Sequence, residues 1–361
     1  MARLGDIPAE WAVIAADPPR AFGAVVGRAI LRGTADDFRV DERLGFAPAG
    51  QGSHLLLRVR KRDANTQWVA RDLARVCGVR AMDVGFAGLK DRHAVAIQWF
   101  TVPAGKRAPA EWLGQEGEGY VVIEAHAHAR KLPRGALAGN AFRIALRSFD
   151  GDRQATDARL AAIVQRGFPN YFGPQRFGRD LANLKELTGD LAVGETPRVS
   201  RFALSAARSL LFNAVLAERV TGLTWDRLLD GDIANLHGSN SIFPVEGPDS
   251  GLRARAEALD LHPTGPLWGT GGMPGSESAA QLEATVLSRF TTVTRLLAAA
   301  RLRAARRPLR TVAEDLRWEW SEHESGVTLT LSFFLRSGSF ATALIGELVD
   351  TRGLDEGDSG D

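Results

Sequence analysis

The sequence predicts an α+β fold in which a sheet of neighbouring strands is covered by helices on one side. Residues 94–102 alternate, with Val95, Ile97 and Trp99 on one face, a pattern typical of a strand that buries at least one face. A helical pattern precedes this strand, and a second short strand ends just before it. The order helix, strand, loop, strand favours an α+β arrangement.

The composition sets limits on the class of protein. The chain has 361 residues, 45% hydrophobic and 24% charged, which is enough for two domains with cores. No apolar run approaches the roughly 20 residues that span a bilayer, and the first residues make a poor secretory signal. Cys77 is the only cysteine, so no disulfide can form within the chain. We therefore expect a cytoplasmic protein.

The net charge is only +2, but the charge is unevenly distributed. Residues 281–310 hold seven Arg and one Glu, and residues 121–147 hold five Lys or Arg and one Glu. Local basic segments on a nearly neutral chain are typical of contact with RNA or DNA. Ordinary solvated helix faces produce the same pattern, so this observation alone does not decide between the two.

Local signals place the elements of the first half. Residues 1–20 are weakly patterned and predict a peripheral arm. Asn65 or Thr66 can cap a helix that ends before Gly78. Residues 45–53 are rich in Gly and Pro and predict a loop. Over the whole chain, apolar or alternating runs predict strands at 24–31, 54–60, 84–87, 94–102, 121–125, 140–146, 316–320 and 327–335.

The character of the chain changes near residue 165. Residues 167–178, GFPNYFGPQRFG, interleave aromatic rings with Arg176. Such a segment can stack unpaired RNA bases, or it can be a domain junction whose rings simply pack. Beyond it, residues 221–275 are rich in loops, and the last eight residues are acidic and expected to be disordered. Apolar spacing predicts helices at 203–219, 282–307 and 341–349.

The turn between the two central strands is the strongest candidate for chemistry. Asp91 stands between Lys90 and Arg92, shortly after Gly88. Flanking cations favour the ionised carboxylate and attract a polyanion, which makes Asp91 a candidate nucleophile or base beside a phosphate-bearing substrate. A solvated turn has the same composition. His126 and His128 lack a third ligand, so no metal site is expected.

Several separated motifs together resemble the tRNA pseudouridine synthase D (TruD) family. They occur in family order and cover most of the chain. The matching stretches are DDFRVDE (36–42), GFAGLKDRHAV (85–95), RKLPRGALAGNAF (130–142), NYFGPQRFG (170–178), SAARSLLFN (205–213), GPLWG (265–269) and RSGSFAT (336–342). His93 and Pro133 depart from the family pattern.

The resemblance implies a domain organisation. A pseudouridine-synthase catalytic domain with a mixed, mainly antiparallel sheet would comprise residues 1–165 and 305–361. An inserted α+β domain, specific to the family, would comprise residues 166–304. The change of composition near residue 165 and the return of strands after residue 310 agree with this division.

The resemblance also implies a function and a set of site residues. The chain would isomerise uridine 13, in the D arm of tRNA, to pseudouridine, as a monomer without cofactor, metal or membrane. Asp91 would be the catalytic aspartate, with Arg32, Arg39 or Lys90 as its cationic partner. Phe38, Asn140, Phe142 and Phe340 would line the uridine pocket. Contacts with tRNA would come from Lys90, Arg92, Arg130, Lys131, Arg134, Arg176, Arg306 and Arg307.

Two other functions are compatible with parts of the sequence. An RNA methyltransferase would use the glycine-containing stretch before Asp91 as a cofactor loop, and it would require a parallel, doubly wound sheet. A noncatalytic RNA-binding protein would keep Asp91 for structural reasons. Neither alternative accounts for all the motifs together.

Overall fold

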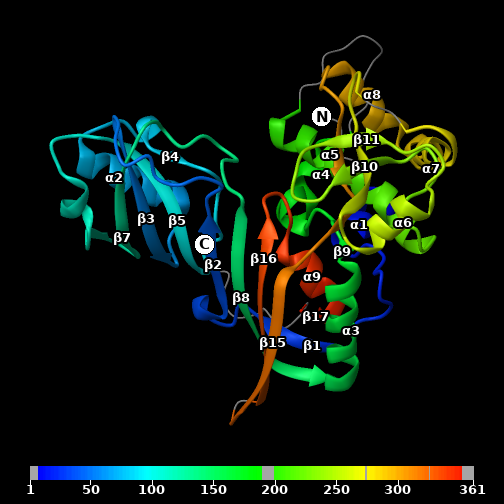
Figure 1. Ribbon diagram of the computed structural model, residues 1–361, viewed down its shortest axis with the longest axis horizontal. Coiled ribbons are helices and arrows are strands. Elements are labelled where there is room, and N and C mark those ends of the chain that lie inside the picture. The colour runs from blue at the N-terminus through cyan, green and yellow to red at the C-terminus, as the bar shows by residue number, and fades with distance from the viewer. Residues whose placement is uncertain (1–6, 189–198, 273–274, 325, 352–361) are drawn as a thin grey trace, which may run out of the picture. The chain divides into compact units, whose positions relative to one another are not determined.

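A long mixed sheet organises one part of the protein. The computed structural model describes residues 7–188, 199–272, 275–324 and 326–351. In this sheet the strand order is β15-β16-β8-β2-β5-β3-β7-β6, with β1 joined to β8 and β17, and β4 joined to β5 (Figure 1). The pairs β2–β5 and β1–β17 are parallel, and the other described pairs of this sheet are antiparallel. The expected mixed, mainly antiparallel sheet is thus confirmed.

The strands of this sheet come from both ends of the chain. They are β1 (Gly27–Leu31), β2 (Phe38–Arg43), β3 (His54–Arg62), β4 (Gly85–Phe86), β5 (Val95–Pro103), β6 (Glu116–Gly117), β7 (Tyr120–His128), β8 (Gly139–Gly151), β15 (Glu314–His323), β16 (Gly326–Arg336) and β17 (Val349–Asp350). Three short 3₁₀ helices connect them: η1 (Ala35–Asp37), η2 (Ala81–Asp83) and η3 (Pro109–Trp112).

The register of the central strands decides which side chains share a face. In β2, Val40 lies opposite Ala96 of β5 and opposite Phe142 of β8. Ala96 in turn lies opposite Lys61 of β3. Because side chains alternate along a strand, these residues share one face with Phe38 and Glu42. The intervening arginines of β2 and β3 point to the other face.

Helix α2 (Thr66–Cys77) covers part of the buried face (Figure 1). The Asn65 side chain accepts a hydrogen bond from Gln67 N at 2.8 Å, and Gly78 ends the helix with a left-handed φ of 68°. Leu73 of α2 packs in one cluster with Leu57 of β3 and its neighbours. The predicted caps are confirmed, and they fix where the chain enters and leaves this layer.

The strands and helices of the long sheet form one of two compact units. Of the residues that the structure describes, those within 26–152, 314–338 and 349–351 form this unit, and those within 7–25, 153–313 and 339–348 form the second. The second unit therefore includes segments that the sequence-based division assigned to the catalytic domain. The boundaries at 165 and 304 remain predictions about family domains, whereas the compact units follow from packing.

The second unit is built around helix α5 (Arg201–Thr221), most of whose residues are buried. A smaller sheet has the strand order β11-β10-β12-β13, and a two-stranded ribbon pairs β14 with β9. The other elements are α1 (Ala9–Ala16), α3 (Arg153–Arg166), β9 (Phe168–Pro169), η4 (Pro174–Phe177), η5 (Arg179–Leu181), α4 (Ala182–Lys185), β10 (Ile233–Leu236), β11 (Ile242–Pro244), α6 (Ser250–Glu257), β12 (Leu261–Leu267), α7 (Glu277–Ser288), α8 (Thr291–Ala299), β13 (Ala305–Pro308), β14 (Arg310–Thr311) and α9 (Ala341–Leu348).

Two sequence predictions are wrong in this unit. The arm expected at the N-terminus contains α1, whose Trp11 is buried and stacks on Phe290 with ring centroids 6.3 Å apart. The single helix expected over 282–307 is two helices that break at Phe290, followed by strand β13. Pairing with β12 draws this segment out of the helix, since Arg306 lies opposite Pro266.

The aromatic segment near residue 170 packs within the second unit. Tyr171, Phe172 and Phe177 are all buried in its core. Phe172 is also fixed by hydrogen bonds from its own N–H to Asn213 and from Asn213 to its carbonyl oxygen. The packing interpretation therefore holds for these three rings. The acidic last residues lie outside the described part of the chain.

Candidate active site

The Asp91 loop connects β4 to β5, which lie side by side as an antiparallel pair. A doubly wound methyltransferase sheet would place a helix after this loop, so the structure contradicts that alternative. The Asp91 side chain is 45% exposed, and its Oδ2 accepts a hydrogen bond from Arg32 Nη2 at 2.5 Å. Of the three cations considered as its partner, Arg32 is therefore the one that the structure selects.

The position of Arg32 follows from the backbone just after β1. Arg32 has a φ of 64°, a left-handed conformation that is uncommon for residues with a side chain. Its guanidinium carbon lies 4.3 Å from the centroid of the Phe38 ring, and the side chain is 24% exposed. The cation thus links the carboxylate of Asp91 to the aromatic residues of the sheet.

Three phenylalanines from three strands form an aromatic wall beside this ion pair. Phe38 meets Phe142 edge to face, with centroids 5.9 Å apart. Phe142 in turn stacks on Phe333 at 5.4 Å and 25°. Phe38 and Phe333 are buried, whereas Phe142 is half-buried. The alternating pattern of 327–335 predicts a strand, but only its pairing with β8 brings Phe333 to this site.

Asn140 lies two residues before Phe142 on β8. Its Oδ1 is buried and has no hydrogen-bond partner among the described residues. A buried acceptor without a partner is rare in folded proteins, and a functional role is one reason to keep one. In the strand register Asn140 lies opposite Glu42.

Lys90 and Arg39 have partners other than Asp91. The Lys90 ammonium donates to Glu42 Oε1, and the two side chains are 9% and 0% exposed. Arg39 pairs with Asp36 at 3.1 Å. Lys90 is thus directed into the protein, behind the Asp91 loop.

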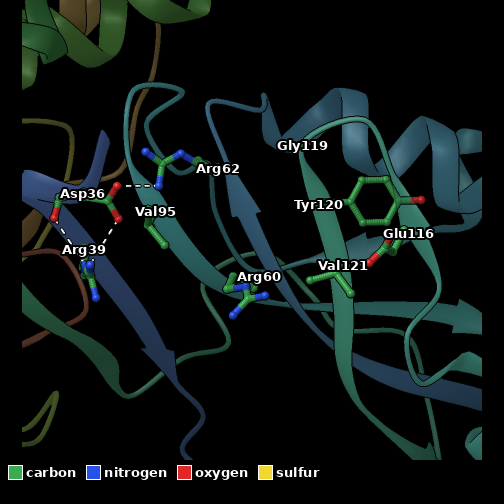
Figure 2. Close-up of a pocket in the computed structure, with 9 residues that line it drawn as sticks. All are labelled: Asp36, Arg39, Arg60, Arg62, Val95, Glu116, Gly119, Tyr120 and Val121. Carbon is green, nitrogen blue, oxygen red and sulfur yellow. Dashed lines mark hydrogen bonds and ion pairs between the residues drawn. The ribbon is translucent and has the colours of Figure 1, made fainter. Parts of the chain in front are cut away.

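A hollow of about 530 Å³ lies on the face of the long sheet that points away from Phe38 and Phe142 (Figure 2). Figure 2 shows Asp36 bridged to Arg39 and Arg62, with the Arg60 guanidinium lying apart from these three. The hydrogen bond from Arg62 is the main cause of a lowered pKa of the Asp36 carboxyl. Arg39 and Arg62 both lie opposite Val95, four residues after Asp91. The hollow is lined by Asp36, Arg39, Arg60, Arg62, Val95, Glu116, Gly119, Tyr120 and Val121.

The other predicted cations fall into two groups. Arg92, Arg130, Lys131 and Arg134 are exposed in the unit that holds Asp91. Arg176 belongs to the second unit, where it donates to Ser209 Oγ at 3.1 Å. The remaining two, on β13, have internal partners.

The two arginines of β13 are held inside the second unit. Arg306 is 4% exposed and pairs with Glu283 at 2.6 Å. Arg307 donates to Asn170 Oδ1 at 2.6 Å, and burial lowers the pKa of Arg307 to about 9. Their guanidinium groups point inward because β13 is a strand of the smaller sheet and not the end of a helix.

Phe340 also belongs to the second unit. Its ring packs against Phe172 with centroids 5.8 Å apart, and it is half-buried. Its predicted role in the uridine pocket remains a prediction.

The two histidines considered as metal ligands have other contacts. His126 approaches Glu124 at 3.4 Å, and His128 stacks on Phe46. Within the described residues, no group of three or more His, Cys, Asp and Glu side chains is arranged to hold a metal ion. In the same part of the chain, no helix has the length and apolar character to cross a membrane.

Comparison with known proteins agrees with the motifs. The family model described as tRNA pseudouridine synthase D (TruD) matches residues 26–198 and 196–348. The tRNA pseudouridine synthase D of Methylococcus capsulatus is 44% identical over 338 residues, covering 92% of this chain and 94% of that protein. The protein of the same name from Nitrosococcus oceani is 44% identical over 340 residues, covering 93% of each chain.

A solved structure shares the fold. The putative TruD protein of Methanosarcina mazei superimposes with a TM-score of 0.73 at 19% identity, covering 96% of this chain and 98% of that one. Together with the family model and the close relatives, this likeness extends over nearly the whole length of the protein. The chain therefore belongs to the tRNA pseudouridine synthase D (TruD) family.

Proposed function

We propose that this protein isomerises uridine 13, in the D arm of tRNA, to pseudouridine, and that Asp91 is its catalytic carboxylate. The observation that carries the proposal is the exposed Asp91 carboxylate, paired with Arg32 beside an aromatic wall. Family membership supports the reaction class. The uridine position and the residue roles come from the motif resemblance.

The reaction needs little beyond a positioned carboxylate. The bond between uracil N1 and ribose C1′ breaks, the base turns, and C5 bonds to C1′; the C5 proton is lost and N1 gains one. The substrate and product have the same atoms, so no redox partner or group donor is required, and we propose no cofactor. Asp91 acts as a nucleophile toward the base or sugar, or as a base that removes a proton.

The aromatic wall gives the uracil ring a place to bind once it has left the RNA stack. Unstacking costs a few kcal/mol, and stacking on aromatic side chains returns about 1–3 kcal/mol per base. We assign this stacking to Phe142, which is the least buried ring of the wall. The unpartnered Oδ1 of Asn140 is a suitable acceptor for an N–H group of uracil.

Exposed cations of the same unit are proposed to hold phosphate groups. Arg92, Arg130, Lys131 and Arg134 are retained from the sequence prediction, and Arg60 and Arg62 of the hollow are added. Contacts of this kind position RNA without reading its sequence. Binding should therefore weaken steeply with salt, and a flat salt dependence would contradict this assignment. We propose a cytoplasmic monomer.

Pseudouridine mapping on tRNA tests the proposal. Wild-type protein is expected to convert uridine 13, and Asp91→Asn is expected to leave it unconverted while still binding the tRNA. Equal conversion by both proteins would remove Asp91 from catalysis. If wild-type protein bound tRNA tightly but converted no uridine, the noncatalytic RNA-binding function would be favoured.

A further inference from the structure

A buried lysine lies directly behind the Asp91 loop. Lys61, near the end of β3, is 0% exposed. Its ammonium donates to the backbone oxygens of Asp91 and Ala64, both at 2.7 Å. A buried charge carries a large desolvation penalty, which is lowered only by hydrogen bonds and nearby opposite charges. One of the two acceptors that hold this ammonium is thus the peptide group of the proposed catalytic residue.

The charges around Lys61 include Asp91 itself. Burial lowers the pKa of Lys61 to about 8, and the negative charge of Asp91 is the strongest influence in the opposite direction. Asp63 and Glu42 act in the same sense as Asp91, whereas Lys90 opposes them. Lys61 and Asp91 are therefore coupled both through a hydrogen bond and through their charges.

Neighbouring side chains hold two further peptide groups of the loop. Thr66 Oγ1 accepts from Lys90 N at 3.0 Å and donates to Gln98 Oε1 at 3.0 Å. Gln98 Nε2 donates to Gly88 O at 2.7 Å. Together with Lys61, these side chains fix the backbone at Gly88, Lys90 and Asp91, so the loop is held at three points over four residues.

Glu42 completes the network from β2. Its carboxylate accepts from the Lys90 ammonium, from Trp99 N at 2.9 Å and from Gln98 Nε2 at 3.4 Å. Filled hydrogen-bonding networks of this kind rigidify the groups that they join. The result is a buried polar layer under a loop whose tip is exposed.

We propose that Lys61 is a positioning residue for the reaction: it holds the Asp91 peptide so that the carboxylate reaches Arg32 and the bound uridine in one fixed orientation. The inference rests on the proposed function of Asp91. A purely structural role would make Lys61 matter for stability alone: its loss would leave two buried carbonyl oxygens without a donor and destabilise the protein, with no change in kcat of the folded form. A small displacement of a catalytic group can instead reduce the rate strongly.

Lys61→Met tests the proposal, because methionine fills similar space without donating hydrogen bonds. The rate can be followed by tritium release from tRNA labelled at C5 of uridine, since that position loses its hydrogen in the reaction. We expect kcat of the folded protein to fall on the order of 10- to 100-fold with KM near the wild-type value. The melting temperature should fall as well, because two buried carbonyl oxygens lose their donor. A kcat close to wild type in folded Lys61→Met would overturn the proposal.

Leu57→Ala is the matched control. Leu57 is equally buried on the same strand and contacts the core beneath α2 and not the Asp91 loop. It should lower the melting temperature and leave kcat unchanged at temperatures where the protein is folded. An equal loss of kcat in folded Leu57→Ala would overturn the proposal, since activity would then follow general packing of the strand.

A second variant keeps the proposal testable if Lys61→Met does not fold. Thr66→Val conserves shape but leaves Lys90 N without its acceptor, so kcat should fall with KM retained. Wild-type kcat in Thr66→Val would then overturn the proposal. Asp91→Asn in the same assay separates the two claims: if it lacks activity while Lys61→Met retains it, only the role of Lys61 fails. An inactive wild-type protein would remove the proposed function and this inference together.

Discussion

Two clusters of arginine and phenylalanine, one in each compact unit, differ in whether they expose a charged group to solvent. Around Asp91, the Arg32 guanidinium lies over Phe38 and pairs with a carboxylate that is 45% exposed. In the second unit, the Arg307 guanidinium lies 4.1 Å from the Phe172 ring and donates to Asn170. The first cluster presents a charged acceptor to solvent, whereas the cation of the second donates to the internal oxygens of Asn170.

This difference shows that residue type alone does not indicate a reactive site. Both clusters combine a cation with packed aromatic rings, and Phe38, Phe142 and Phe172 all fall in motifs that resemble the same family. What distinguishes them is an accessible carboxylate and a buried acceptor without a protein partner at Asn140. The rings of the second cluster are part of the hydrophobic core around α5.

The largest expected effect separates the clusters by activity. Asp91→Asn should lower the rate of pseudouridine formation by about 10²- to 10⁴-fold, the usual contribution of a positioned acid or base, with little change in stability. Arg307→Met should keep the activity of the folded enzyme. Single-turnover rates of both variants measure this contrast, and a comparable rate loss in Arg307→Met would break it.

A second prediction concerns buried charge in the second unit. Burial raises the pKa of Glu347 to about 7. The hydrogen bonds from Ala21 N and Phe22 N and the charges of Arg20 and Arg159 lower this pKa, but their effect is smaller than that of burial. The folded state therefore holds a proton between about pH 4.5 and 7 that the unfolded state has released. This group should make stability fall as pH rises across that window, by at most about 3 kcal/mol, and change little above it.

Denaturant unfolding at several pH values checks this prediction. Glu347→Gln should remove most of that slope, since glutamine does not titrate. An unchanged slope in the variant would show that other groups cause the pH dependence.

The third prediction sharpens the comparison by stability. Arg307→Met leaves the buried Asn170 Oδ1 without its charged donor, and a hydrogen bond to a charged group contributes about 1.5–3 kcal/mol. The free energy of unfolding should fall by about that amount. Arg303→Met, at an exposed position nearby on the chain, is the control and should change it little. Equal stabilities of the two variants would contradict the internal role of Arg307.

The smallest effect is expected at the hollow on the other face of the long sheet. Arg60→Ala should weaken tRNA binding modestly. The slope of log K against log salt should become shallower by about 1, as expected for the loss of one phosphate contact. Its catalytic rate at saturating tRNA should stay the same. Arg253→Ala, an exposed arginine on α6, serves as the control. An identical salt dependence in wild type and Arg60→Ala would exclude this arginine from the RNA-binding surface.

Sequence reasoning succeeded where the signal is local. The cap at Asn65, the end of the helix at Gly78 and the strand predicted over 94–102 depend on neighbouring residues, and each appears in the structure, the strand as Val95–Pro103. It failed for 282–307, where apolar spacing suggested one helix but pairing with β12 made residues 305–308 a strand. The segment before residue 20 was predicted to be a peripheral arm and not a buried helix, because the residues that cover Trp11, Phe290 among them, lie far along the chain.

Motifs and local periodicity were sufficient to predict the family, the α+β fold and Asp91 as the candidate carboxylate. Three contacts became visible only in the folded chain: Arg32 pairs with Asp91, Phe333 stacks on Phe142, and Lys61 donates to the backbone oxygen of Asp91. These contacts depend on strand pairing, because the register between distant segments sets which side chains meet. An alternating pattern shows which residues of a strand share a face, but not which strand lies beside it.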